Sequence, residues 1–323
     1  MLPNFTYERP GSVDEALEHG SSEGAVLHAG GTDLLGCLRD GVFSAKKVVS
    51  LSGLEELRGI SPTRDGGLRV GALTTLTGVA SDPTIAERYT VLAQAAASAA
   101  SPQLRNQGTI GGNICQRPRC WYFRGDWHCL RKGGDTCYAI AGENHFHCIF
   151  GGSGCYIVHP SDTAPALQAL GASVRIASRS GSRTVPIESF FLLPADDIQR
   201  ENLLEPGELV TEVLLPPVAS GTRSVYRKVR DRGAWDFALA GLAAVVTMPG
   251  DSVETASLVL SGVAPKPWRA AEAEGALTGA RLDAETIARV VAASVAGALP
   301  LEHNGYKVAL VRGLMEETLR ALA

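Results

Sequence analysis

The 323-residue sequence lacks several features that would assign it to a broad class at once. It contains no uninterrupted apolar run of about 18 residues, so we expect no membrane-spanning helix. It has no basic excess, with 30 Lys and Arg against 34 Asp and Glu, which argues against a general nucleic-acid-binding protein. The N-terminus lacks a basic region followed by an apolar stretch. We therefore expect a cytoplasmic protein, with export alongside a signal-bearing partner left open.

Familiar site motifs are missing as well. There is no G-x-G-x-x-G turn and no Walker loop, so neither common nucleotide-binding motif is present. No C-x-x-C pair occurs, which weakens the case for a structural zinc site. No nucleophile set and no general base can be argued from spacing, and nothing is typical of a molybdopterin site or a plant-type ferredoxin. We expect no catalytic residue on this chain.

The pattern that is present predicts an α+β protein of two domains. Alternating short strands and helices over residues 1–57 indicate a small α/β lobe, with a capping box at Ser12–Glu15 opening its first helix. A second lobe over 58–216 is expected to contain a long helix at 85–100. The Pro- and Gly-rich stretch near 216–221 is a candidate linker. Beyond it, residues 220–323 show strand-like runs followed by helices, which predicts a C-terminal α+β domain.

Two glycine pairs lie in similar surroundings. One is in Ala29-Gly30-Gly31-Thr32-Asp33 and the other in Thr109-Ile110-Gly111-Gly112-Asn113. Glycine allows main-chain N–H groups to approach a phosphate closely, so each pair is a candidate anion cradle. Either one alone is also compatible with an ordinary tight turn, because glycine is the usual turn residue.

Six of the seven cysteines crowd into about forty residues directly behind the second glycine pair. Such a patch in a long chain is more typical of a metal site than of a disulfide scaffold. A zinc site with histidine ligands, and unligated or disulfide-linked cysteines, remain alternatives. Cys37 stands apart and is expected to be a buried helix residue. The clustered cysteines are Cys115, Cys120, Cys129, Cys137, Cys148 and Cys155.

Taken in order, these segments resemble the FAD-binding subunits of the xanthine dehydrogenase, aldehyde oxidase and carbon monoxide dehydrogenase group of molybdenum hydroxylases. The resemblance covers essentially the whole chain. It implies an FAD-binding domain of the PCMH/vanillyl-alcohol-oxidase type, made of two α/β lobes, followed by the C-terminal α+β domain. The matching segments are Ala29–Leu35, Arg105–Asn113, Pro160–Asp162, Tyr226–Arg230 and Asp236–Ala238.

The resemblance also implies the residues that hold the cofactor. Asp162 matches the family's acidic residue after the second turn, Lys228 matches a flavin-side lysine, and Leu192 or Leu193 falls where an apolar residue packs on the flavin ring. Both glycine turns would bind the FAD diphosphate through main-chain amides. The residues of the two turns are Leu27, His28, Ala29, Gly30, Gly31, Thr32, Asp33, Leu34, Thr109, Gly111, Gly112 and Asn113.

The cysteine segment, about residues 115–158, resembles an insertion found in the flavoprotein subunits of 4-hydroxybenzoyl-CoA reductase and bacterial aldehyde oxidoreductases. In those relatives four cysteines bind a 4Fe–4S cluster. The resemblance assigns this role to Cys120, Cys129, Cys137 and Cys155 and leaves Cys115 and Cys148 spare. Thiolates are the soft ligands that such clusters require.

The implied function is that of an oxidoreductase subunit in a heterotrimeric complex. A large molybdopterin-binding partner and a small partner with 2Fe–2S clusters would deliver electrons to the FAD and the 4Fe–4S cluster on this chain. An external carrier would exchange electrons with these two centres. The substrate stays open among aldehydes, N-heterocycles such as purines, and an aromatic acyl-CoA. The alternative is a non-catalytic zinc-binding scaffold or interaction protein with empty glycine turns.

Overall fold

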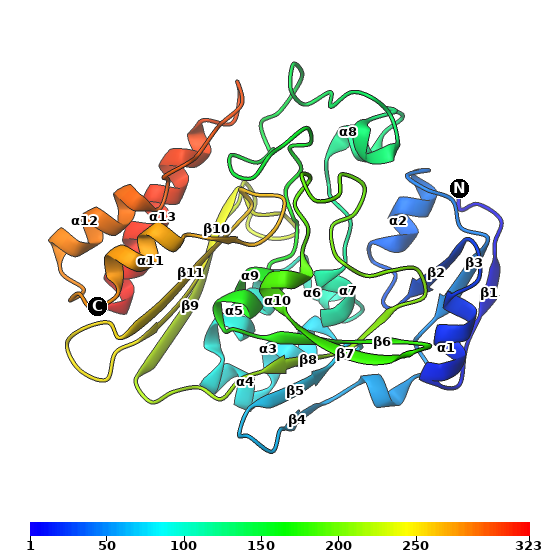
Figure 1. Ribbon diagram of the computed structural model, residues 1–323, viewed down its shortest axis with the longest axis horizontal. Helices are drawn as coiled ribbons and strands as arrows, with labels where there is room; N and C mark the ends of the chain where they lie inside the picture. Colours follow the sequence, from blue (N-terminus) through cyan, green and yellow to red (C-terminus); the bar gives the residue numbers. More distant parts are fainter.

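The computed structural model describes residues 1–323, and its first lobe is a small parallel sheet with two helices (Figure 1). The strand order is β1-β3-β2. As predicted, the Ser12 side chain caps the first helix by accepting the Glu15 amide; the Glu15 carboxylate, however, accepts the amide of Gly11. The elements are β1 (Thr6–Glu8), α1 (Val13–Gly20), β2 (Ala25–His28), α2 (Leu34–Arg39), β3 (Lys47–Ser50) and the 3-10 turn η1 (Glu55–Leu57).

The second lobe is built on a five-stranded antiparallel sheet of order β4-β5-β8-β6-β7. Its strands are β4 (Ile60–Pro62), β5 (Leu68–Gly71), β6 (Ser173–Ser178), β7 (Gly181–Pro186) and β8 (Leu209–Leu215). Its helices are α3 (Leu76–Ser81), α4 (Pro83–Arg88), α5 (Thr90–Ser98), α6 (Pro102–Arg105), α7 (Ile110–Ile114), α9 (Thr163–Ala169) and α10 (Ile187–Phe190).

The single helix predicted over 85–100 is wrong, because Tyr89 divides it into α4 and α5. The Tyr89 backbone (φ −126°, ψ 46°) lies outside the helical region. Its side chain is fully buried, and its hydroxyl donates to the carbonyl of Pro216 at 2.8 Å. The break between α4 and α5 therefore accompanies a hydrogen bond of the buried Tyr89 hydroxyl at the end of the lobe.

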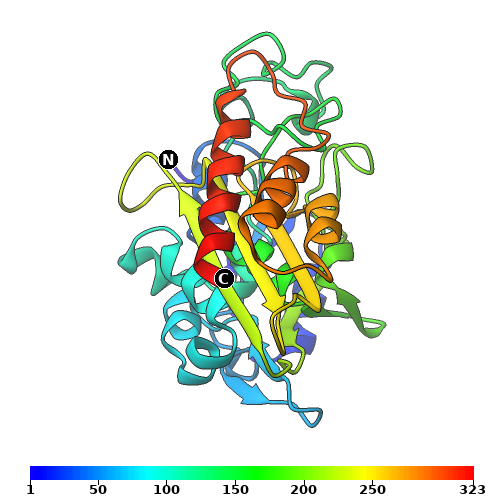
Figure 2. The same ribbon diagram turned by 90° about the vertical axis from the view of Figure 1, so that its left-hand side faces the viewer.

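The C-terminal domain is an antiparallel sheet of order β12-β11-β10-β9 with helices α11, α12 and α13 against one face (Figure 2). Neither β9 nor α11 was predicted. Its elements are β9 (Thr222–Val229), β10 (Ala240–Thr247), β11 (Thr255–Ser261), β12 (Trp268–Arg269), α11 (Ala271–Leu277), α12 (Ala284–Ala293) and α13 (Tyr306–Leu322).

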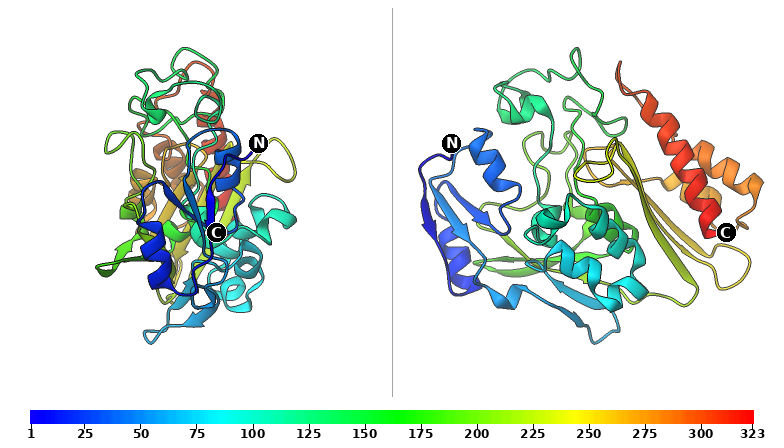
Figure 3. Two further views of the ribbon diagram at one scale, coloured as in Figure 1. Left: turned by 90° about the vertical axis from the view of Figure 1, so that its right-hand side faces the viewer. Right: turned by 180° about the vertical axis from the view of Figure 1, so that it is seen from behind.

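The cysteine segment is mostly irregular and stands at one edge of the molecule, beside the start of α13 (Figures 1 and 3). It contains only α8 (Trp121–Arg124) and the 3-10 turn η2 (Leu130–Lys132). Ile149 and Phe150 leave it to join the core of the C-terminal domain, where both amides donate to the carbonyl of Val263. The segment is thereby fixed to that domain.

None of the helices of the protein combines the length and apolarity needed to cross a bilayer.

Candidate functional site

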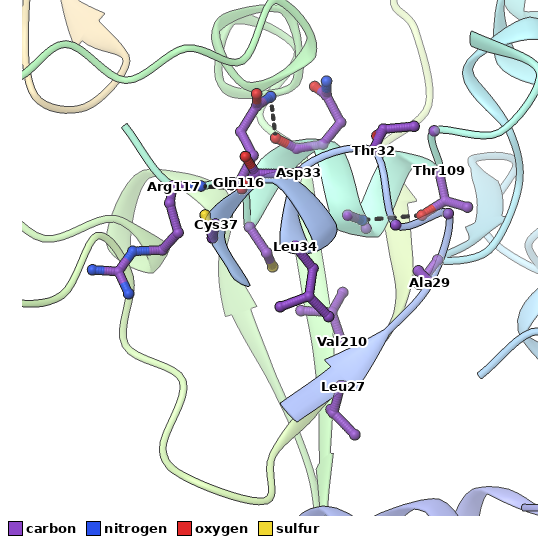
Figure 4. A pocket seen from close by; sticks show the side chains of 18 of the residues that line it. Leu27, Ala29, Thr32, Asp33, Leu34, Cys37, Thr109, Gln116, Arg117 and Val210 are labelled. Carbon is purple, nitrogen blue, oxygen red and sulfur yellow. Dashed lines mark hydrogen bonds between the residues drawn. The ribbon is translucent and has the colours of Figure 1, made fainter. Parts of the chain in front are cut away.

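A cavity of about 670 Å³ lies between the two lobes, where both glycine turns meet (Figure 4). Its wall includes the turn residues Ala29–Leu34 and Thr109 with Gly111–Asn113. Apolar side chains such as Leu27 and Val210 complete it. The volume and the mixture of apolar and polar walls suit a large organic cofactor.

The first turn presents unused main-chain donors. None of the amides of residues 30–34 donates a hydrogen bond within the chain. Gly31 has a left-handed backbone (φ +72°), and helix α2 starts at Leu34 without a side-chain cap from Asp33. Successive unpaired N–H groups at a glycine turn and a helix start form a site for an anion such as a diphosphate.

The second turn differs, because its amides are already used. Ile110 donates to the carbonyl of Thr74 and Gly111 to that of Ala72, both at 2.9 Å. The amide of Gly112 donates to the Thr109 hydroxyl, and the amide of Asn113 to the Thr109 carbonyl. A Cβ on Gly111 would lie 2.8 Å from the Cβ of Ala72. This glycine pair lets α7 pack closely on the chain after β5, and its amides, unlike those of the first turn, are paired within the chain.

Gly30 brings the two turns into contact. A Cβ at this position would lie 1.9 Å from the carbonyl oxygen of Gln107. Only a residue without a side chain fits there, so the contact between the lobes depends on it.

Asp33 connects the first turn to the base of the cysteine segment. Its carboxylate accepts the Arg117 amide and the guanidinium of Arg124, both at 2.7 Å, and it pairs with Arg119 at 2.9 Å. Glu201 continues the network by pairing with Arg117 at 2.7 Å and with the buried Arg131 at 2.6 Å. The Asp33 side chain thus anchors the cysteine segment beside the cavity.

Asp162 lines the cavity, whereas Lys228 supports it from behind. The Lys228 ammonium donates to the Asp162 carboxylate at 2.8 Å, and the Tyr226 hydroxyl donates to the other oxygen, also at 2.8 Å. Burial, reinforced by the Asp162 charge, raises the pKa of Tyr226 well above its ordinary value. Strand β9 therefore holds Asp162 in place across the domain boundary.

Besides Lys228, two further predicted residues do not lie on the cavity wall. Leu192 is absent from it and pairs through its amide with the carbonyl of Glu201. His28 packs beneath Gly31, and burial lowers its pKa. The wall instead carries Trp235, which the sequence reasoning missed. Trp235 has a left-handed backbone (φ +54°), and its amide donates to the carbonyl of Ala100, the other non-glycine residue with positive φ.

The four cysteines assigned by resemblance share a second, small cavity. Cys120, Cys129, Cys137 and Cys155 all line it, Cys115 lines the large cavity, and Cys148 lines neither. Burial raises the pKa of the Cys120 thiol to about 12. No three His, Cys, Asp or Glu side chains are arranged around a single metal-ion position.

His147 is the histidine on the wall of this small cavity. Its Nε2 lies 3.3 Å from Sγ of Cys120. Burial, followed by the charge of Lys307, lowers the His147 pKa to about 4.

Comparison with known proteins decides the family. Residues 3–218 match the family described as the FAD binding domain in molybdopterin dehydrogenase, and residues 224–322 match the CO dehydrogenase flavoprotein C-terminal domain. The chain belongs to the FAD-binding subunits of the molybdenum hydroxylases. The predicted family and fold class are confirmed.

Individual relatives match this FAD-binding subunit over nearly their whole length. It is 36% identical to the aldehyde oxidoreductase FAD-binding subunit PaoB of Escherichia coli strain K12, covering 98% of this chain and 97% of the relative. It is 30% identical to the carbon monoxide dehydrogenase medium chain of Hydrogenophaga pseudoflava, covering 99% and 97%. A solved structure of the carbon monoxide dehydrogenase from that organism, lacking the Mo-pyranopterin moiety, matches with a TM-score of 0.80 at 29% identity, covering 100% of this chain and 98% of the other.

These relatives confirm the prediction of an oxidoreductase subunit. They are subunits of an aldehyde oxidoreductase and of a carbon monoxide dehydrogenase.

Proposed function

We propose that this subunit holds FAD in the cavity between its lobes and relays electrons within a three-subunit molybdenum hydroxylase. The observation that carries the proposal is the run of unpaired amides at residues 30–34, which faces a cavity of about 670 Å³. Bound FAD would supply a redox centre that takes up and releases electrons singly or in pairs.

The residues of the cavity fit such a dinucleotide. The amides of residues 30–34 would hold the diphosphate, and no side chain needs to move to free them. Asp162, fixed by Lys228 and Tyr226, would present a carboxylate acceptor to the cofactor. Leu27, Val210 and Trp235 would exclude water from its apolar parts.

We further propose that Cys120, Cys129, Cys137 and Cys155 hold a 4Fe–4S cluster. Four thiols on the wall of one cavity match the ligand number and type that this cluster requires. Tyr122, Tyr138 and Tyr156 also line that cavity and would shield the cluster from water. The cluster would connect the flavin with an external electron carrier.

Replacing one of these ligands tests the cluster assignment. Cys137→Ser should lose or convert the cluster, with lower iron and acid-labile sulfide contents, while FAD stays bound because Cys137 does not line the large cavity. Cys148→Ser, at a cysteine that lines neither cavity, is the matched control and should keep both. Unchanged iron in Cys137→Ser would reject the ligand set. Zinc in place of iron in the native protein would favour the scaffold interpretation.

The proposed partners rest on the family, and the proposed substrate class rests on one relative. We propose a large molybdopterin-binding subunit, a small subunit with 2Fe–2S clusters, and an aldehyde as the substrate oxidised by the complex. The similarity to an aldehyde oxidoreductase subunit supports the aldehyde. Purification of the tagged native complex, with metal and flavin analysis and turnover assays on aldehydes and purines, tests this. Activity on purines alone would overturn the substrate class.

A further inference from the structure

The His147 ring has one hydrogen-bond partner, and that partner is a cysteine sulfur. The side chain is buried, its Nε2 lies 3.3 Å from Sγ of Cys120, and its Nδ1 has no hydrogen-bond partner. A buried polar ring is costly unless its N–H meets an acceptor. The ring proton is therefore best placed on Nε2, where the sulfur accepts it.

The main chain around His147 is fixed from the C-terminal domain. The buried amide of Asn304 donates to the carbonyls of His147 and Cys148 at 3.1 and 3.0 Å. The Lys307 ammonium donates to the carbonyl of Phe146 at 3.0 Å and to that of Gly262 at 2.6 Å. These bonds leave the His147 backbone little freedom, so the direction of its ring is set by the fold.

We propose that His147 is a positioning residue that donates its Nε2–H to the Cys120 thiolate and raises the reduction potential of the cluster bound there. The inference rests on the proposed cluster. Reduction of the cluster adds negative charge that the ligand sulfurs share. A hydrogen bond to a ligand sulfur therefore stabilises the reduced cluster more strongly than the oxidised cluster. Removal of the donor should therefore make the cluster harder to reduce.

The test compares three variants of the intact complex. His147→Leu removes the donor, His147→Gln keeps an N–H at similar reach, and His145→Leu is the control. His145 lies two residues away on the same segment but is exposed and stacks on Tyr306, with ring centroids 4.6 Å apart. The readouts are iron and acid-labile sulfide contents and the midpoint potential of the cluster. Titration followed by electron paramagnetic resonance gives the potential, and faster relaxation separates its signal from 2Fe–2S signals.

We expect His147→Leu to keep its iron and to show a lower potential. A tenfold loss in the reduced-to-oxidised ratio at fixed ambient potential corresponds to about 59 mV for a one-electron couple. His147→Gln should recover part of the shift, and His145→Leu should match the native protein. An unchanged potential in His147→Leu would overturn the inference. Loss of iron from both His147 variants would also overturn it, by making His147 a ligand. A native complex without iron would instead refute the proposed cluster itself.

Discussion

The two Gly-Gly turns of this subunit are alike in sequence and different in structure. Each has a glycine pair beside a hydroxyl residue and an Asp or Asn; the first pair precedes helix α2, and the second lies within helix α7. At the first turn the amides of residues 30–34 are unpaired. At the second, the amides of Ile110 to Asn113 bond to Thr74, Ala72 and Thr109.

The difference separates two uses of glycine. At residues 30–34 the turn exposes donors to a ligand, whereas at Gly111 the missing Cβ allows α7 to approach Ala72. A Gly-Gly pair indicates that the backbone approaches another group closely. That group can be a cofactor or another part of the same chain. Substitutions should therefore separate loss of flavin from loss of stability.

The largest effect is expected for Gly30→Ala, because Gly30 serves both turns. The new Cβ would collide with the Gln107 carbonyl, which is main chain and cannot turn away. We expect a loss of stability of about 3 kcal/mol or more, together with loss of FAD. Thermal melting and the flavin-to-protein absorbance ratio measure the two. Gly275→Ala, where a Cβ meets nothing within 4 Å, is the control. A Gly30→Ala protein that melts normally and keeps its flavin would remove the proposed contact between the lobes.

A smaller effect, mainly on stability, is expected for Gly111→Ala. Its Cβ would lie 2.8 Å from the Ala72 Cβ and 3.0 Å from the Ala72 carbonyl oxygen. Overpacking of this kind costs about 1–3 kcal/mol, and the folded fraction should still bind FAD. The bulkier Gly111→Val is expected to lose FAD, through displacement of α7. Gly112→Ala, whose Cβ would meet the Thr109 hydroxyl at 3.0 Å and the Ala29 Cβ at an ordinary 3.9 Å, should be milder. Loss of flavin from Gly111→Ala at unchanged melting temperature would contradict the packing role.

Local signals in the sequence predicted much of the fold, and long-range contacts account for the errors. The Ser12 cap acts on an amide three residues away, so the start of α1 could be read directly. The break at Tyr89 depends on Pro216, more than a hundred residues further along, and no local pattern reveals it. The charged strand β9 was missed because its burial is set by pairing with β10 and contact with α13.

The site shows the same division. Glycine pairs and clustered cysteines are visible as patterns, and family resemblance selected four thiols that do share a cavity. Which amides stay unpaired depends on neighbours such as Ala72, so the two turns could not be distinguished from sequence. Asp33 was expected to bind cofactor; it lines the cavity, and its carboxylate also bonds to three arginines of the cysteine segment. Trp235 is held at the cavity by the hydrogen bond from its amide to the Ala100 carbonyl, and no local sequence pattern predicts this long-range contact.

Gly31→Ala tests the first turn alone. We expect it to lower stability less than the substitutions above and to act mainly on FAD affinity. Gly31 has φ +72°, which costs an alanine about 1–2 kcal/mol, and the new Cβ would lie 2.5 Å from Nε2 of His28. The turn must change shape to relieve both strains, and its unpaired amides move with it. We expect FAD affinity to fall about tenfold, equal to about 1.4 kcal/mol, as measured by flavin release on dilution. Gly36→Ala, in helix α2 with only an ordinary contact to Arg124, should leave affinity unchanged. If Gly31→Ala binds flavin normally while Gly111→Ala does not, the second turn is the cradle and the roles assigned to the two turns must be exchanged.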